Sequence, residues 1–92
     1  MAFEWDERKS QANLAKHGID FRTASLAFDD PFALTMRDEL HSDDESRFIM
    51  LAAIGTGAIL FVVFTVPSQD VIRLISARAA TRREKEIYEE AK

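Results

Sequence analysis

Polar residues that favour helix ends alternate with apolar runs in the first third of the chain and frame two short helical segments. Asp6 is a typical N-cap for the first segment, and Gly18 stands where helices commonly end. Asp20 is a second N-cap, and Pro31 ends the second segment because proline cannot continue the hydrogen-bond ladder. In order, the pattern predicts a strand at Phe3–Trp5, a helix from Asp6 to about His17, and a short helix with apolar positions at Phe21, Ala24, Leu26 and Phe28.

The middle of the chain is rich in apolar residues that favour strands, separated by turn residues. Gly55-Thr56-Gly57 predicts a hairpin turn, Arg37–Ser46 an acidic loop, and Pro67-Ser68-Gln69 a further turn. The strands expected around these turns are Phe32–Met36, Arg47–Ile54, Ala58–Val66 and Val71–Ser76. The segment from Ala79 to about Ala91 has many good helix formers and no glycine, which favours a final helix.

These elements follow one another in the order β-α-α-β-β-β-β-α, and a length of 92 residues suits one domain over residues 1–92. Short turns between consecutive strands favour antiparallel pairing. We therefore expect an α+β fold, in which two N-terminal helices and one C-terminal helix pack on one face of an antiparallel sheet of about four to five strands.

The stretch from Phe48 to Val66 carries no charge and is close to the ~20 residues that a membrane-spanning helix needs. Its glycine turn and its content of Ile, Val, Phe and Thr favour two buried strands instead. The N-terminus shows no export signal. The chain has no cysteine, which excludes a disulfide scaffold, a thiolate nucleophile and a cysteine zinc site. We expect a cytoplasmic protein without a membrane partner.

The net charge of −4 hides an asymmetry between two segments. Acidic residues dominate from Asp29 to Arg47. From Val71 to Ile87 the bases Arg73, Arg78, Arg82, Arg83 and Lys85 outnumber Glu84 and Glu86. A local positive field suits a polyanion whatever the net charge. The alternative is a solvated helix face, in which Arg82 pairs with Glu86 and Arg78 with an acid of the loop.

Strand alternation predicts that Arg73 points away from the helix-covered face, because Ile72 and Leu74 point toward it. Arg78 follows just beyond the predicted strand. Arg82 and Arg83 fall in the first turns of the final helix, where the helix dipole is positive and an anion would relieve the crowding of cations. These arginines are the candidate anion site.

Two histidines are further candidates. His17 ends the first helix, where it serves either as a helix-capping residue or in catalysis. His41 lies near Asp43 and Asp44, which is a weak signal for a metal site because no ligand-spacing motif accompanies it. We expect no metal and no cofactor. Trp5 and the seven phenylalanines are expected to fill the core.

Motifs along nearly the whole chain resemble those of the BrnT toxins. The residues that carry this resemblance are Phe3-Glu4-Trp5-Asp6, Lys9, Asn13, Lys16-His17-Gly18, Phe21, Ala24, Phe28-Asp29-Asp30-Pro31, His41, Asp44-Glu45, Arg47-Phe48, Ile72-Arg73-Leu74-Ile75-Ser76-Ala77-Arg78, Ala80-Thr81-Arg82-Arg83-Glu84 and Tyr88-Glu89. The resemblance implies a RelE-like fold and a metal-independent ribonuclease toxin of a type II toxin–antitoxin pair that arrests translation and growth. It also implies a BrnA-like ribbon-helix-helix antitoxin, which neutralises the toxin and represses the operon, so that DNA is contacted only through the antitoxin.

In such cleavage the ribose 2′-oxygen attacks the neighbouring phosphorus, and the enzyme must stabilise negative charge on the phosphate oxygens. On the resemblance we expect Arg73 and Arg78 to hold the scissile phosphate. The residues expected to assist RNA binding are Arg82, Arg83, Lys16 and Ser76. The candidates for proton transfer are His17, Glu84 and Tyr88. Glu84 and Tyr88 have the alternative role of fixing the last helix against the sheet.

The chain departs from the family pattern at Thr65–Gln69, which contains no ionisable group where family members often have histidine or arginine. This departure leaves open an inactive homologue that binds antitoxin and acts as a co-repressor. The third hypothesis is a small metabolic or structural protein unrelated to RNA. The apolar strands of the Gly55–Gly57 hairpin are expected to leave an exposed edge that pairs with the antitoxin or with a second copy of the chain.

Overall fold

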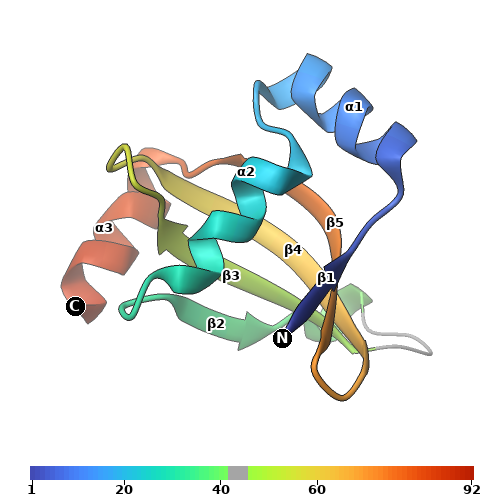
Figure 1. Cartoon of the computed structure of the whole chain (residues 1–92). Coiled ribbons are helices and arrows are strands. Elements are labelled where there is room, and N and C mark those ends of the chain that lie inside the picture. The colour runs from blue at the N-terminus through green and yellow to red at the C-terminus, as the bar shows by residue number, and fades with distance from the viewer. Residues whose placement is uncertain (42–45) are drawn as a thin grey trace.

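A five-stranded mixed sheet forms the centre of the protein, which a computed structural model describes over residues 1–41 and 46–92 (Figure 1). The strands are β1 (Ala2–Glu4), β2 (Leu34–Arg37), β3 (Arg47–Ala53), β4 (Ile59–Ser68) and β5 (Val71–Ala79). They lie in the order β1-β5-β4-β3-β2. β3 and β4 are therefore inner strands, and the expectation that their hairpin leaves an exposed edge is wrong. The α+β class and the predicted order of elements are confirmed.

One pair of strands differs from the antiparallel arrangement that the sequence predicts. β2, β3, β4 and β5 pair antiparallel with their neighbours, but β1 pairs with β5 in parallel, with Ala2 opposite Val71 and Glu4 opposite Arg73. Parallel neighbours need a long connection, and here all the other strands lie between β1 and β5 in sequence. Turn residues report only on consecutive strands, so they do not reveal this pairing.

Within residues 1–41 and 46–92, three α-helices flank the sheet: α1 (Glu7–His17), α2 (Phe21–Ser25) and α3 (Arg82–Ala91), with a 3₁₀ turn, Leu26–Asp29, following α2. The predicted caps are confirmed. Asp6 accepts hydrogen bonds from the first backbone N–H groups of α1, Asp20 accepts one from Thr23, and Gly18 ends α1 at φ +74°. Glycine reaches this left-handed region without the steric cost that a Cβ brings.

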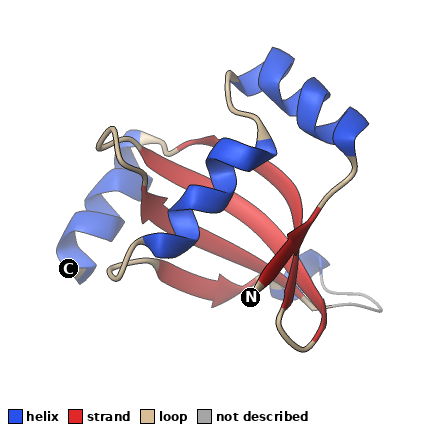
Figure 2. Ribbon diagram, in the orientation of Figure 1, coloured by secondary structure: helices blue, strands red, loops and turns tan. Residues whose placement is uncertain are grey.

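The sequence predicted all three helices on one face of the sheet. This is wrong, because α3 lies on the other face. Phe21 and Ala24 of α2 pack against Leu60, Val62 and Leu74 on the first face of the sheet. On α3, Tyr88 packs with Leu51 and Ile59, which belong to the opposite face because strand side chains alternate. Figure 2 shows α2 across the sheet and α3 at one end of it. α3 therefore covers one end of the second face. Val63, Ser76 and Arg78 on the same face stay partly exposed, and we call this part the open face.

Several boundaries also differ from the prediction. The second predicted helix is α-helical only to Ser25 and continues as a 3₁₀ turn to Asp29, and β2 begins at Leu34 rather than at Phe32. β5 continues to Ala79 and α3 begins at Arg82, because Thr81 and Glu84 form a capping box at that point. β4 runs through Pro67 to Ser68, and the chain turns at Asp70, whose φ is +66°. Proline is tolerated here because the register of β4 and β5 is irregular between Thr65 and Ser68, and strand prolines are found at such irregularities.

The charge-free stretch from Phe48 to Val66 forms β3, its glycine turn and β4, as expected. Among the described residues, no helix is long and apolar enough to cross a membrane.

Candidate functional site

The open part of the second sheet face carries three of the predicted site residues. Arg73, Ser76 and Arg78 of β5 lie opposite Thr65, Val63 and Phe61 of β4, which alternate along one face. Arg73 thus points away from the face that α1 and α2 cover, as predicted. Ser76 and Arg73 are three residues apart, a spacing that would place them on opposite faces of a regular strand. The register shift next to Val63 and Phe64 inserts one residue and brings them to the same side.

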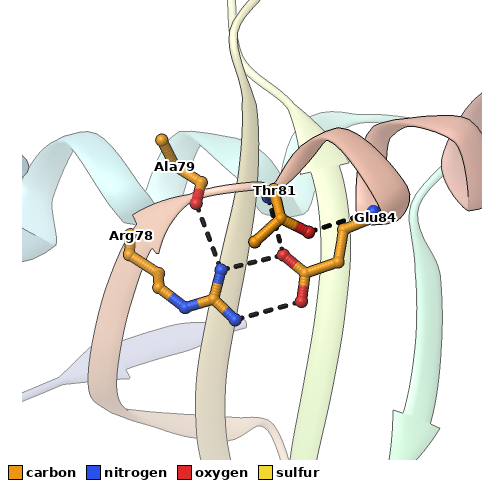
Figure 3. A network of polar contacts seen from close by, with 4 residues as sticks. All are labelled: Arg78, Ala79, Thr81 and Glu84. Carbon is orange, nitrogen blue, oxygen red and sulfur yellow. Dashed lines mark hydrogen bonds and ion pairs between the residues drawn. The ribbon is translucent and has the colours of Figure 1, made fainter.

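Arg78 is held by a network that ties the end of β5 to the start of α3 (Figure 3). Its Nη1 and Nη2 donate to the two carboxylate oxygens of Glu84 at 2.8 and 3.0 Å, and Nη1 also donates to the carbonyl of Ala79 at 3.2 Å. The guanidinium carbon lies 3.9 Å from the centroid of the Phe61 ring. A bidentate ion pair and a stacked ring together fix both the direction and the plane of the guanidinium.

Glu84 joins this network from the first turn of α3. Besides the two bonds from Arg78, its Oε1 accepts the backbone N–H of Thr81 at 2.8 Å, and the Thr81 hydroxyl accepts the backbone N–H of Glu84. The hydrogen bond from Arg78 is the largest cause that lowers the pKa of Glu84, and the same bond raises the pKa of Arg78. Both groups are therefore charged throughout the neutral range.

Arg73 contacts the neighbouring strand β1. Its Nε donates to Glu4 Oε2 at 2.6 Å, and the two side chains are each a little under half exposed. Glu4 and Arg73 are cross-strand partners in the parallel pair, so the fold places this carboxylate beside this arginine. This contact was not predicted from the sequence, because no local pattern marks the pairing of β1 with β5.

Arg82 and Arg83 open α3, as predicted, and extend into solvent with 96% and 72% of their side chains exposed. Both lie near Glu86, at 3.8 and 3.5 Å. The pairing of Arg82 with Glu86 is the one that the solvated-face alternative expects. Such exposed pairs contribute little to stability, so they leave the guanidinium groups available to an anion.

Lys16 and His17 lie exposed in the last turn of α1, which is a different element from the arginine-bearing strand. α1 itself is fixed to β5 by Asn13, whose side-chain amide donates to the carbonyl of Ala77 at 2.7 Å and accepts the N–H of Ala77 at 3.2 Å. β1 pairs with β5 only from Val71 to Arg73, so among the described residues the backbone of Ala77 has no strand partner on that edge. The Asn13 amide forms the two hydrogen bonds that a neighbouring strand would otherwise supply. α1 is thus anchored one residue from Arg78.

Tyr88 lies in the core, with 2% of its surface exposed. Its hydroxyl donates to Asp30 Oδ2 at 2.5 Å, and this bond, together with burial, raises the pKa of Tyr88 to about 12. Asp30 also accepts the backbone N–H groups of Phe32 and Ala53. These contacts join α3 to the segment before β2 and to β3, which agrees with the structural alternative for Tyr88.

A shallow groove of about 430 Å³ lies on the same open face as the arginines. It has mostly apolar walls and reaches Ser76 and Phe61, and its lining residues are Asp38, Leu40, Arg47, Ile49, Phe61, Val63, Ile75 and Ser76. Ser76 is therefore placed between this groove and the arginines of β5. An extended polymer that crosses the face would meet apolar surface next to cations.

The described residues contain no group of three or more side chains suited to hold a metal ion. Asp43, Asp44 and the side chain of His41, which carried the weak metal signal, lie outside the residues that the structure describes.

Three residues that contact the candidate site were not predicted from the sequence. They are Phe61 under Arg78, Glu4 beside Arg73 and Asp30 beside Tyr88. Each contact joins elements that are distant in sequence, and no local pattern marks such pairs. Thr81 and Glu84 did carry a local signal, since a threonine followed three residues later by glutamate is the capping-box pattern.

Comparison with known proteins places the chain beside a ribonuclease toxin family and a solved structure. A family model described as the ribonuclease toxin BrnT of type II toxin–antitoxin systems matches residues 5–84. The crystal structure of the Brucella abortus ribonuclease toxin BrnT is similar to this fold, with a TM-score of 0.71 and 26% sequence identity, over 89% of this chain and 99% of that chain. No match was found among functionally curated proteins. The family match includes all the candidate arginines and Glu84, whereas Tyr88 lies beyond it.

Proposed function

Because the chain belongs to the BrnT family of ribonuclease toxins of type II toxin–antitoxin systems, we propose that it cleaves RNA in the cytoplasm and so arrests translation and growth. The observation that carries the proposal is the arrangement of Arg73, Ser76 and Arg78 on one open sheet face, with Arg82 and Arg83 at the start of the adjoining helix. Arginine suits phosphate because it is always charged and donates two parallel hydrogen bonds.

In this proposal Arg78 and Arg73 bind the scissile phosphate and stabilise the charge that develops as the 2′-oxygen attacks phosphorus. The attack forms the new O–P bond and breaks the bond from phosphorus to the 5′-oxygen, which leaves a 2′,3′-cyclic phosphate and a free 5′-hydroxyl. The 2′-proton passes to a base, and the leaving oxygen takes a proton from an acid. The 2′-hydroxyl of RNA supplies the nucleophile, so we propose that no metal is needed.

Of the proton-transfer candidates, His17 is the one whose exposure supports the role. Lys16 beside it, and Arg82 and Arg83 on α3, are proposed to bind phosphates that flank the reacting one. The contacts of Tyr88 support a structural role, because its buried hydroxyl already donates to Asp30.

A BrnA-like antitoxin with a ribbon-helix-helix part is the proposed partner, and contact with DNA is expected only through it. A short reading frame next to this gene that is predicted to form a ribbon-helix-helix protein supports this partner, and its absence argues against it.

The second candidate function is an inactive homologue that binds antitoxin and acts as a co-repressor. The segment Thr65–Gln69 favours it, because β4 ends there without the basic residue that family members often carry. Tight antitoxin binding without RNA cleavage by the isolated protein would establish this function.

Expression in bacteria without the antitoxin tests the toxin proposal. Growth arrest by the wild-type chain is expected, and Arg73→Ala and Arg78→Ala should each relieve it while circular dichroism and thermal unfolding show a folded protein. Arg22→Ala serves as the control, because Arg22 lies exposed on α2 rather than on β5 or α3. Arrest that is equally strong with both folded arginine variants contradicts the site.

A further inference from the structure

Glu84 has few free lone pairs with which to take part in proton transfer. Oε1 accepts Arg78 Nη1 and the backbone N–H of Thr81, both at 2.8 Å, and Oε2 accepts Arg78 Nη2 at 3.0 Å. The Glu84 side chain is 19% exposed, less than the 35% of its partner Arg78. A carboxylate held in this way presents its charge to one cation and has little access to substrate.

The guanidinium of Arg78, in contrast, keeps one complete donor edge. A guanidinium carries five N–H groups in a fixed plane. Nη1 donates to Glu84 and to the Ala79 carbonyl, and Nη2 donates one hydrogen to Glu84. Within the described chain, Nε and the second hydrogen of Nη2 have no acceptor. These two N–H groups are parallel neighbours, which is the geometry that two oxygens of one phosphate accept.

We propose that Glu84 is a positioning residue: it grips the Nη edge of Arg78 so that the Nε edge of the same guanidinium receives the phosphate of RNA. The proposal rests on the proposed RNA-cleaving function and assigns Glu84 a part in it other than proton transfer. Carboxylate and phosphate bind adjacent edges of one cation, which share Nη2 but use different hydrogens of it, so the ion pair need not open for substrate.

Three restraints act together on Arg78. Glu84 fixes its end, the Ala79 carbonyl fixes the Nη1 side, and the ring of Phe61 fixes its plane. Glu84 is in turn held by the capping box at the start of α3. A long, flexible side chain that is held before substrate arrives loses little entropy on binding. Displacement of such a group by about 1 Å can cost on the order of 100-fold in rate.

Two other roles for Glu84 predict different results. If its carboxylate competes with phosphate for Arg78, its removal should tighten RNA binding. If it transfers a proton, its removal should abolish one limb of the pH–rate profile.

Glu84→Gln tests the positioning role with little change to the fold, because glutamine also serves in a capping box and keeps an acceptor for Thr81. Glu90→Gln is the matched control: it makes the same change of charge on the same helix, but Glu90 lies exposed in the last turn of α3, six residues beyond Glu84. The probe is a short RNA methylated on every 2′-oxygen, which binds but cannot be cleaved. The measurements are ¹⁵N NMR of the arginine side chains, the Kd of the probe and kcat/KM for unmodified RNA across pH.

In the wild type we expect resolved Nη signals for Arg78 and a shift of its Nε–H on addition of the probe. In Glu84→Gln the Nη signals should average, the Kd should rise about tenfold, and kcat/KM should fall by about 10- to 100-fold with both pH limbs retained. Glu90→Gln should stay within about twofold of the wild type in both binding and rate.

Tighter binding by Glu84→Gln, a lost pH limb, or unchanged binding and rate would each overturn the proposal. Failure of the wild type to bind the probe would overturn it as well. If the NMR and binding results hold but the wild type cleaves no RNA, the positioning role of Glu84 stands and the nuclease function fails.

Discussion

Replacement of Tyr88 by phenylalanine separates the structural role of this residue from a catalytic one. The substitution removes only the hydroxyl and leaves the ring in its place against Leu51 and Ile59. Asp30 then loses a buried donor at 2.5 Å but keeps the backbone N–H groups of Phe32 and Ala53. The loss therefore concerns one hydrogen bond to a charged group in a well-packed site.

Hydrogen bonds to charged groups contribute about 1.5–3 kcal/mol, so Tyr88→Phe should lower the free energy of unfolding by about 2 kcal/mol at pH 7. For a domain of this size that corresponds to a fall in Tm of about 8–16 °C. The pKa of Tyr88 is raised from 10.0 to about 12 in the folded state, so the bond contributes fully below pH 10 and is lost as pH rises through 12. The difference between wild type and variant should therefore shrink above pH 10.

Urea unfolding at pH 7, 9 and 11, together with RNA cleavage per folded molecule at pH 7, checks this reasoning. Leu14→Ala is the control, because Leu14 lies on the exposed side of α1, away from the Tyr88 cluster. A loss of less than about 0.5 kcal/mol in the free energy of unfolding at pH 7 would contradict the strength assigned to the bond between Tyr88 and Asp30. A more than tenfold loss of cleavage in the folded variant would instead show that Tyr88 takes part in catalysis.

Two further predictions concern stability. Asn13→Ala should lower the free energy of unfolding by about 3 kcal/mol, because it removes the hydrogen-bond partners of the buried N–H and C=O of Ala77. Gln11→Ala, on the exposed side of α1, should change this free energy by less than about 0.5 kcal/mol. Urea unfolding of the two variants measures the difference. Acid should destabilise the protein below about pH 4.5, because the pKa values of Asp20, Asp30 and Glu84 are lowered on folding and the unfolded chain binds more protons there; stability that stayed constant from pH 6 to 3 would contradict this.

Local signals predicted most of the elements, because caps and turns depend on neighbouring residues. Asp6 and Gly18 marked the two ends of α1 correctly, Asp20 marked the start of α2, and the Gly55–Gly57 turn separated β3 from β4. The parallel pairing of β1 was not predictable in this way, since it is decided by packing between the two ends of the chain.

The site was predicted in its residue types but not in its contacts. Alternation along β5 placed Arg73 correctly, yet it could not foresee the register shift that brings Arg73, Ser76 and Arg78 to one face. Nor could it show that Glu84 and Phe61 hold Arg78, because a salt bridge at a strand–helix junction depends on the angle between the two elements. The family resemblance supplied the candidates, and the three-dimensional contacts separate their roles.

Single-turnover cleavage by the purified protein tests whether it cleaves RNA through the 2′-hydroxyl with Arg78 on the scissile phosphate. An unstructured RNA is compared, with EDTA present, with the same RNA in which every 2′-hydroxyl is replaced by hydrogen, and the wild type is compared with Arg78→Ala. We expect the wild type to cleave only the RNA with 2′-hydroxyls and to leave 2′,3′-cyclic phosphate ends. Loss of one phosphate-binding arginine should slow this cleavage by about 100-fold or more. Cleavage of the 2′-deoxy strand, dependence on added metal, or full activity of folded Arg78→Ala would contradict it.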